Sequence, residues 1–210
     1  MKPPLIAALL LASAAPAPAR AQQASALANP PANAPAGWQE ARADDLAREP
    51  RRHFTLPGKF LPPVPANANA ANPPSLLLKC AAVPRSTRVG KFRVGAVVVG
   101  LPLEIHMVEL FERKGGLSYL PEVAVSYRLD EGKAVTDDWP PRADKTSAEF
   151  DKSEFRKMLR ARTLLVNLSD KDGGELRLQF DLPDPAAPAA PGSIATAEVA
   201  RACGVPAIQP

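Results

Sequence analysis

The stretch from Thr163 to Pro183, TLLVNLSDKDGGELRLQFDLP, decides the expected fold. Two runs of alternating apolar and polar residues flank the segment DKDGG, and this alternation is the period of a strand with one buried face. Glycine in the middle permits the positive φ that tight turns between antiparallel strands require. We therefore predict a β-hairpin. Its core-facing positions are expected to be Leu164, Val166, Leu168, Leu176, Leu178, Phe180 and Leu182.

The acidic residues of the same segment raise the alternative of a calcium-binding loop. An EF-hand loop places oxygen ligands at its positions 1, 3 and 5, glycine at 6 and glutamate at 12. Counted from Asp170, position 5 is Gly174, position 6 is Glu175 and position 12 is Asp181, at the far end of the second strand. The segment does not match the EF-hand pattern, so we interpret it as a turn and predict no metal site.

Three further stretches predict strands. Residues 75–83, SLLLKCAAV, form a short apolar run typical of a buried strand. Residues 92–116 are rich in valine and leucine and are broken at a glycine and a proline, which favours two strands. Residues 120–135 contain a clean alternation in which Val123, Val125, Tyr127 and Leu129 share one face.

Two short helices complete the expected domain. One is expected at about 153–161, with a serine or aspartate cap, and the other in IATAEVARACG, at 194–204, where glycine ends it. The fold class is therefore mainly β: an antiparallel β-sandwich or rolled sheet over residues 75–204, with 205–210 as a tail.

The N-terminus reads as a secretory signal peptide. Lys2 supplies a positive end, residues 5–15 form an apolar run of about ten residues, and Ala19-Arg20-Ala21 offers small residues at the cleavage positions. Cleavage is expected before Gln22, although an uncleaved anchor is the alternative. The leader, residues 1–21, and the heavy use of alanine and proline favour the bacterial periplasm, without a membrane-spanning segment.

Charge gives no sign of a nucleic-acid partner. The formal net charge of +4 falls to +2 when Lys2 and Arg20 leave with the leader, because residues 1–21 contain no other charged side chain. The pI of about 9.2 is not accompanied by a basic stripe.

Residues 22–74 are rich in proline, alanine and asparagine, and we interpret them as a flexible tether. A short helix is possible within residues 40–49. The candidates for a peptide that docks on a partner lie in or beside this island and are Trp38, Arg51, Arg52, His53 and Phe54. The alternative is that they pack on the domain.

The two cysteines, Cys80 and Cys203, predict one disulfide bond. An isolated even pair in an oxidising compartment is most simply a structural bridge, and the alternative is two free thiols or a redox pair. Redox pairs usually have the spacing C-x-x-C, which this pair lacks.

No catalytic or cofactor motif stands out. The sequence has no nucleophile elbow, P-loop or dinucleotide-binding glycine pattern. Asp137 and Asp138 beside Trp139 raise two alternatives: a carboxylate pair of a cell-wall glycan hydrolase, and a sugar-binding platform. The competing interpretation is a solvated loop that the tryptophan anchors to the core.

The order of features from Val123 to Cys203 resembles a known family. The segments are YRLDEGKAVTDDW, FRKMLRARTLLVNLSDKDGGELRLQFDLPD and AEVARACG. They are similar to the C-terminal part of the TagO/VasI family, periplasmic proteins associated with type VI secretion. The family's N-terminal cysteine-containing segment is replaced here by the proline-rich stretch. The resemblance implies a non-enzymatic accessory domain and offers no catalytic residues.

These observations predict a secreted, non-enzymatic accessory protein of the cell envelope that binds a protein partner, by an edge strand or by the tether. The alternatives are a glycan- or small-ligand-binding sandwich and, less favoured, a glycan hydrolase.

Overall fold

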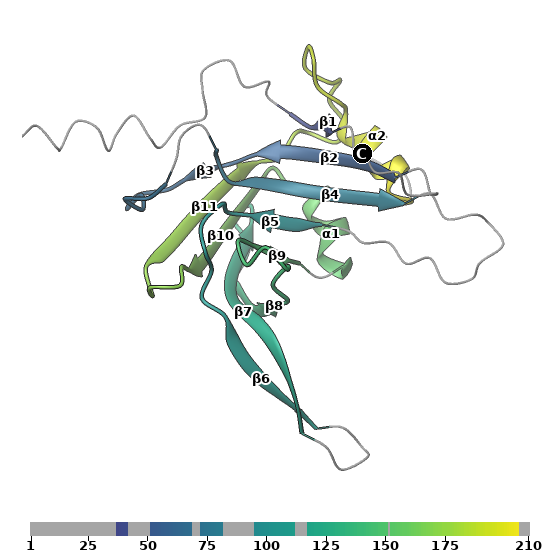
Figure 1. Ribbon diagram of the computed structural model, residues 1–210. Helices are drawn as coiled ribbons and strands as arrows, with labels where there is room; N and C mark the ends of the chain where they lie inside the picture. Colours follow the sequence, from purple (N-terminus) through teal and green to yellow (C-terminus); the bar gives the residue numbers. More distant parts are fainter. Residues whose placement is uncertain are drawn as a thin grey trace, which may run out of the picture.

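The computed structural model describes residues 37–41, 51–68, 72–81, 95–111, 117–150 and 152–205. The predicted signal peptide and residues 206–210 of the predicted tail lie outside these ranges. The described residues form a mainly β domain of two antiparallel sheets with two short helices (Figure 1). The predicted fold class is thus confirmed.

Within the described ranges, the first sheet has five strands and the second has six. In spatial order the first contains β1 (Gln39–Ala41), β2 (Arg51–Pro57), β4 (Ser75–Ala81), β5 (Ala96–Val98) and β9 (Ser147–Glu149). The second contains β3 (Lys59–Phe60), β11 (Glu175–Asp181), β10 (Thr163–Ser169), β7 (Leu117–Leu129) and β6 (His106–Phe111), with β8 (Val135–Trp139) also paired to β7. The helices are α1 (Lys152–Met158) and α2 (Thr196–Ala202).

The predicted hairpin of residues 163–183 is confirmed as β10 and β11. Their register runs without interruption from Thr163 opposite Asp181 to Ser169 opposite Glu175. The Asp170 carboxylate accepts hydrogen bonds from the backbone N–H groups of Asp172 at 2.9 Å and Gly174 at 2.8 Å, so it organises the turn itself. The core-facing side chains of both strands are buried, namely Leu164, Val166, Leu168, Leu176, Leu178 and Phe180.

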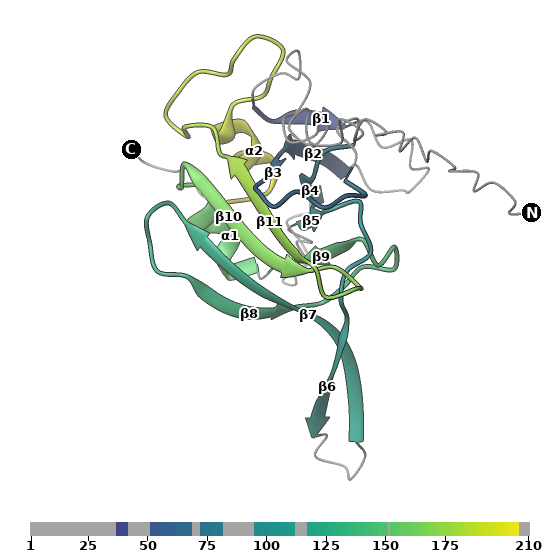
Figure 2. The same cartoon turned by 90° about the vertical axis from the view of Figure 1, so that its left-hand side faces the viewer.

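The core lies between the two sheets, which pack face to face (Figure 2). Alternate side chains of β2 and β4 point toward β10 and β11 because successive residues of a strand face opposite sides. Burying such side chains stabilises the fold by about 1.5–3 kcal/mol each. The largest fully buried ones are Trp38, Phe54, Phe155, Phe180, Leu56, Leu76, Leu78, Leu159, Leu176, Leu178, Val97 and Val99.

The domain begins earlier than the sequence predicted. Residues 22–74 were expected to be a tether, yet β1, β2 and β3 fall within them, and β2 pairs with β4 over seven residues. The alternation in RRHFTLP places Phe54 and Leu56 in the core, and Pro57 ends the strand, where a missing N–H is tolerated. The prediction of a helix within residues 40–49 is wrong for Glu40 and Ala41, because both belong to β1. Residues 42–50 lie outside the described ranges.

Gly58 forms the corner at which the chain passes from the first sheet to the second. It lies between the end of β2 and the start of β3, and its N–H donates to the Pro74 carbonyl at 2.7 Å. A Cβ atom at this position would come within 2.4 Å of the Phe180 ring. Only glycine therefore allows β3 to reach β11 beside a filled core.

The Cys80–Cys203 disulfide is present, so the predicted bridge is confirmed. It joins β4 to the residue that follows α2, across 123 positions of sequence, and both cysteines are buried. Val205, placed by the sequence in the tail, packs partly against the core and donates its N–H to the Ala200 carbonyl. No helix in the described ranges has the length and apolar character needed to cross a bilayer.

Truncation tests the revised boundary. A chain that lacks residues 1–36 retains every described strand and should melt cooperatively. A chain that lacks residues 1–74 loses β1, β2 and β3, exposes the apolar face of the second sheet and should show no cooperative transition by near-UV circular dichroism. A cooperative melt of the shorter chain at an unchanged midpoint would contradict the structural role of β2.

The disulfide gives a second test. Cys80→Ser and Cys203→Ser should lower the melting temperature equally, since each removes the same cross-link, and the loss should not exceed about 4–5 kcal/mol by the chain-entropy model. The double variant should match either single one in thermal unfolding. A marked difference between the two single variants would show that one cysteine contributes mainly by packing.

Candidate functional site

Trp139, a candidate sugar platform in the sequence, is buried in an aromatic cluster. Its ring centroid lies 5.6 Å from that of Tyr127 and 5.9 Å from that of Phe150, and only 2% of the residue is exposed. Its indole Nε1–H donates to Asp137 Oδ2 at 3.1 Å. A sugar has no open ring face to stack on, so Trp139 is a core residue.

Asp137 and Asp138 are not arranged as a carboxylate pair. They are consecutive in β8, so their side chains point to opposite faces of the sheet and cannot flank one glycosidic bond. Asp137 also accepts the N–H of Asp138 at 2.9 Å, which leaves both of its oxygens engaged. Asp138 is exposed, on the outer face of the sheet with Glu122.

The candidate docking residues near the N-terminus, Trp38 and Arg52, pack on the domain and do not extend away from it. Trp38 is buried and accepts the N–H of Ile194 on its carbonyl at 2.8 Å. The Arg52 guanidinium donates to Glu40 at 2.6 Å and to Glu198 of α2 at 3.0 Å. These hydrogen bonds, to Glu40 first, raise the pKa of Arg52 above its ordinary value. Arg51 lies in β2, and its side chain is outside the described part.

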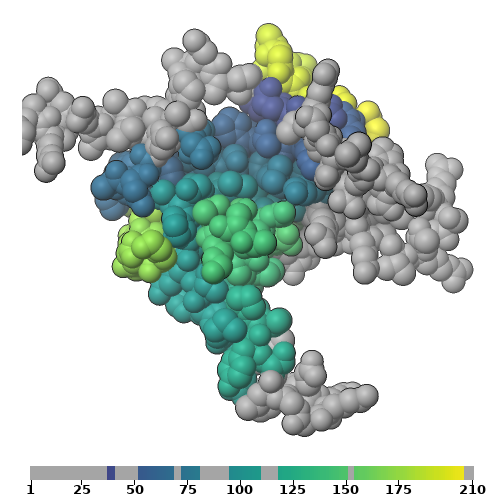
Figure 3. Space-filling model, in the orientation of Figure 1, coloured from purple at the N-terminus to yellow at the C-terminus, as the bar shows by residue number. Residues whose placement is uncertain are grey.

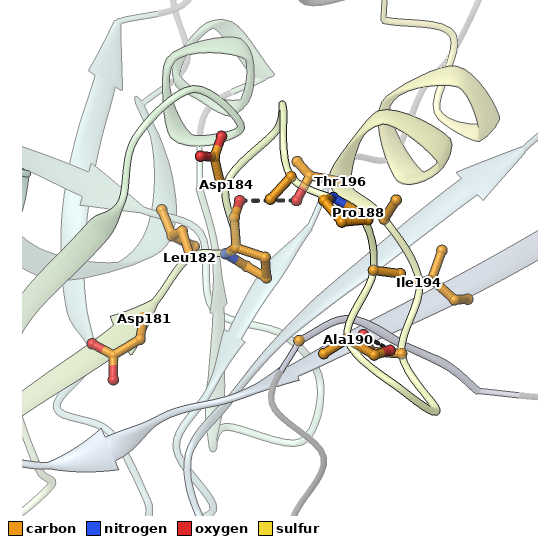
Figure 4. A pocket seen from close by; sticks show the side chains of 13 residues that line it. Asp181, Leu182, Asp184, Pro188, Ala190, Ile194 and Thr196 are labelled. Atoms are coloured by element: carbon orange, nitrogen blue, oxygen red, sulfur yellow. Dashed lines mark hydrogen bonds between the residues drawn. The ribbon is translucent and has the colours of Figure 1, made fainter.

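A cavity of about 300 Å³ lies beside the proline-rich connection between β11 and α2 (Figure 4). Leu182, Pro188 and Ile194 give it an apolar wall, while the carboxylates of Asp181 and Asp184 point away from it in Figure 4. Thr196 Oγ1 already donates to the Pro183 carbonyl at 3.0 Å. Specific small-molecule sites combine apolar walls with convergent polar groups, so this cavity is the weaker candidate.

The stronger candidate is a two-stranded ribbon that projects from the second sheet. We call the ribbon β6 together with residues 117–122 of β7. Among the described residues, this part of β7 pairs only with β6. β8 pairs with β7 from Val123 to Tyr127, and β10 pairs with β7 from Ser126 to Leu129. Figures 1 and 2 show the ribbon extending away from the body, and Figure 3 shows the same protrusion in space-filling form.

Apolar side chains of the ribbon are exposed to solvent. Met107 is 60% exposed, Tyr119 51% and Leu120 44%, and Val135 of β8 is the remaining large exposed hydrophobic residue among those described. The register places Met107 and Tyr119 on one face and Leu120, opposite Val108, on the other. Contiguous exposed apolar surface on a folded protein is typical of an interaction site.

Carboxylates surround the base of the ribbon. Glu122 lies opposite His106, whose Nε2 is 3.9 Å from Glu104. Burial, followed by the negative charges of Asp138 and Asp137, raises the pKa of the Glu122 carboxyl above its ordinary value. No cluster of metal-ligating side chains is found within the described ranges.

Sequence reasoning predicted the strands of the ribbon but not its projection. The structure shows one sign of the projection in the length of β7, whose 13 residues far exceed the five or six typical of a strand. The sequence contained another sign. β7 contains Pro121, and proline inside a strand indicates that hydrogen bonding is incomplete on one side.

Comparison of the chain with protein-family models, with curated proteins and with solved structures gives no match.

The contact between Asp137 and Trp139 predicts unequal effects of neighbouring substitutions. Asp137→Ala leaves the buried indole N–H unpaired and should reduce the free energy of unfolding by about 1–3 kcal/mol. Asp138→Ala, on the exposed face, should change it by less than about 0.5 kcal/mol. Urea denaturation measures both, and a larger effect at Asp138 would indicate that the exposed carboxylate has a structural role.

Proposed function

We propose that this protein is a non-enzymatic accessory protein of the cell envelope that binds another protein through its ribbon. The proposal is carried by two features of the ribbon together: apolar side chains are exposed on both of its faces, and its strands have no outer neighbour in this part of the sheet among the described residues. A two-stranded ribbon is only marginally stable alone in water. A partner that covers it would bury apolar surface and satisfy backbone groups together.

The mode of binding that fits these features is strand addition. An exposed sheet edge offers unpaired N–H and C=O groups, and an extended segment of another protein can pair with them. The main-chain hydrogen bonds supply affinity, and the alternating side chains supply specificity. The ribbon also extends away from β4 and α2, the elements that the disulfide connects (Figure 1), so binding there leaves the body of the domain unchanged.

Placement in the envelope is part of the proposal. It is supported by the leader-like residues 1–21 and by a buried disulfide, which persists in oxidising compartments. The similarity of residues 123–203 to the TagO/VasI family supports a partner among the envelope components of type VI secretion.

Substitution of the ribbon tests the proposal. A variant with Met107→Ser, Tyr119→Ser and Leu120→Ser should capture its envelope partner at least about tenfold less well in photo-crosslinking followed by mass spectrometry, because it removes the apolar contact residues. Val135→Ser is the matched control, since Val135 is similarly exposed but lies outside the ribbon. The control should capture the same partner as the unmodified protein.

Hydrogen exchange adds a structural readout to this experiment. If a strand is added to the sheet, the backbone amides of β6 should exchange more slowly when the captured partner is present. Equal capture by the triple variant and the unmodified chain, with melting unchanged, would refute binding through the ribbon.

A further inference from the structure

The cavity beside the connection between β11 and α2 offers mainly apolar contacts to an occupant. Leu182, Pro188 and Ile194 form its apolar wall (Figure 4). Each polar side chain among the described residues that border it already has a partner. These pairs are Thr196 with the Pro183 carbonyl, Ser193 with the Ala190 carbonyl, Asp181 with Lys59 and Gln179, and Asp184 with Arg162. A charged ligand would lose its water there without gaining hydrogen bonds from these side chains, so the cavity fits an uncharged, apolar occupant.

Gly37 brings the N-terminal part of the chain to the wall of this cavity. The residue lines the cavity, and its φ is +119°. A Cβ atom at this position would lie 2.9 Å from Ser193 Oγ, so the backbone of Gly37 lies directly against the connection. The next residue, Trp38, accepts the N–H of Ile194 on its carbonyl. The chain therefore enters the domain beside the cavity, and Ala36 is one peptide bond away from its wall.

The segment before Gly37 has the composition that the cavity requires. Residues 22–36, QQASALANPPANAPA, lie outside the described ranges and contain no charged side chain. Alanine and proline lose almost no side-chain entropy when they are ordered, so binding them costs less than binding longer side chains. An extended proline-rich chain rises about 3.1 Å per residue, so residues 30–36 can reach about 20 Å from Gly37. This reach is enough to cross a cavity of about 300 Å³.

We propose that residues 30–36, which we call the arm, bind in this cavity. The connection between β11 and α2 is then a docking site for an uncharged segment rich in proline and alanine, supplied by the same chain. Covalent attachment gives the arm a local concentration of roughly millimolar order, so weak apolar contacts are enough to hold it. The inference goes beyond binding through the ribbon and does not rest on it, because the cavity and the ribbon share no residue.

Other occupants fit the cavity less well. Residues 206–210 also lack charged side chains, but they follow Val205, which is not among the described residues that line the cavity. The arm of a second copy would have to give up translational and rotational freedom to bind, a cost that the attached arm does not have. Residues 42–50 carry several charged side chains, which the apolar wall disfavours.

Methyl NMR of the full chain tests this docking. The chain has four isoleucines, so selective labelling of their methyl groups isolates the signal of Ile194 in the cavity wall. Nuclear Overhauser contacts are expected between this methyl group and proline protons of the arm. Ala32→Asp combined with Ala34→Asp should abolish these contacts and shift the Ile194 signal, because the apolar wall cannot solvate carboxylates. Ala24→Asp combined with Ala26→Asp makes the same charge change outside the arm and should leave contacts and signal unaltered.

A synthetic peptide adds a test of the same site in trans. The peptide ANPPANAPA, which is residues 28–36, is added at roughly millimolar concentration to the chain substituted at Ala32 and Ala34. It should restore the Ile194 signal of the unmodified chain. A peptide that carries the same two aspartate substitutions is the control and should leave the signal shifted.

Four results would overturn the inference. If Ile194 shows no contact with the arm and has the same signal in both double variants, the arm does not enter the cavity. Contacts that disappear on dilution would assign the occupant to a second copy of the chain, and contacts with residues 206–210 would assign it to the tail. Restoration of the signal by both peptides alike would show that the cavity does not select an uncharged segment. Each of these results leaves capture through the ribbon standing, because the triple apolar variant tests it separately.

Discussion

The bond between Cys80 and Cys203 is the constraint on which the two ends of the domain depend. It fixes the segment after α2 to β4, next to β2 in the first sheet. From there Glu198 of α2 reaches Arg52, and the neighbouring loop pairs with Trp38. A helix of seven residues is too short to be stable alone in water. The covalent link and the ion pair therefore hold α2 in place, and α2 in turn covers the N-terminal edge of the first sheet.

The candidate functional residues of the sequence contribute to the packing and hydrogen bonding of the domain. Trp139 and Asp137 fill and satisfy the interior beside α1, and Trp38 and Arg52 attach the first strand. The surface proposed to bind a partner lies in a part of the molecule that contributes little to the core. This separation is physically sensible, because a buried site residue cannot reach a partner protein, whereas a projecting pair of strands can change its side chains without disturbing the packing between the sheets.

Local periodicity accounts for what could be predicted. The hairpin of β10 and β11, the inner end of β7, and α2 were recognisable because their partners are near in sequence or their alternation is strict. β2 was missed for two reasons. Its partner strand, β4, begins beyond a proline-rich segment, and the many prolines favoured a tether over the strand that the alternation around Phe54 indicates. The ribbon was missed for another reason. Alternation shows which side chains share a face of a strand, but it does not show whether that strand has neighbours on both sides. It therefore cannot distinguish the part of β7 inside the sheet from the part that projects.

The corner at Gly58 has a consequence for the order in which the chain can fold. Immediately after it, β3 pairs with β11, so Lys59 meets Gln179, a residue from near the other end of the chain. Neither sheet can close from N-terminal residues alone, since β9 also completes the first sheet from far downstream. Contacts so distant in sequence form late and slowly. In a chain built in this way, neither sheet can be completed until almost all of the polypeptide has emerged from synthesis.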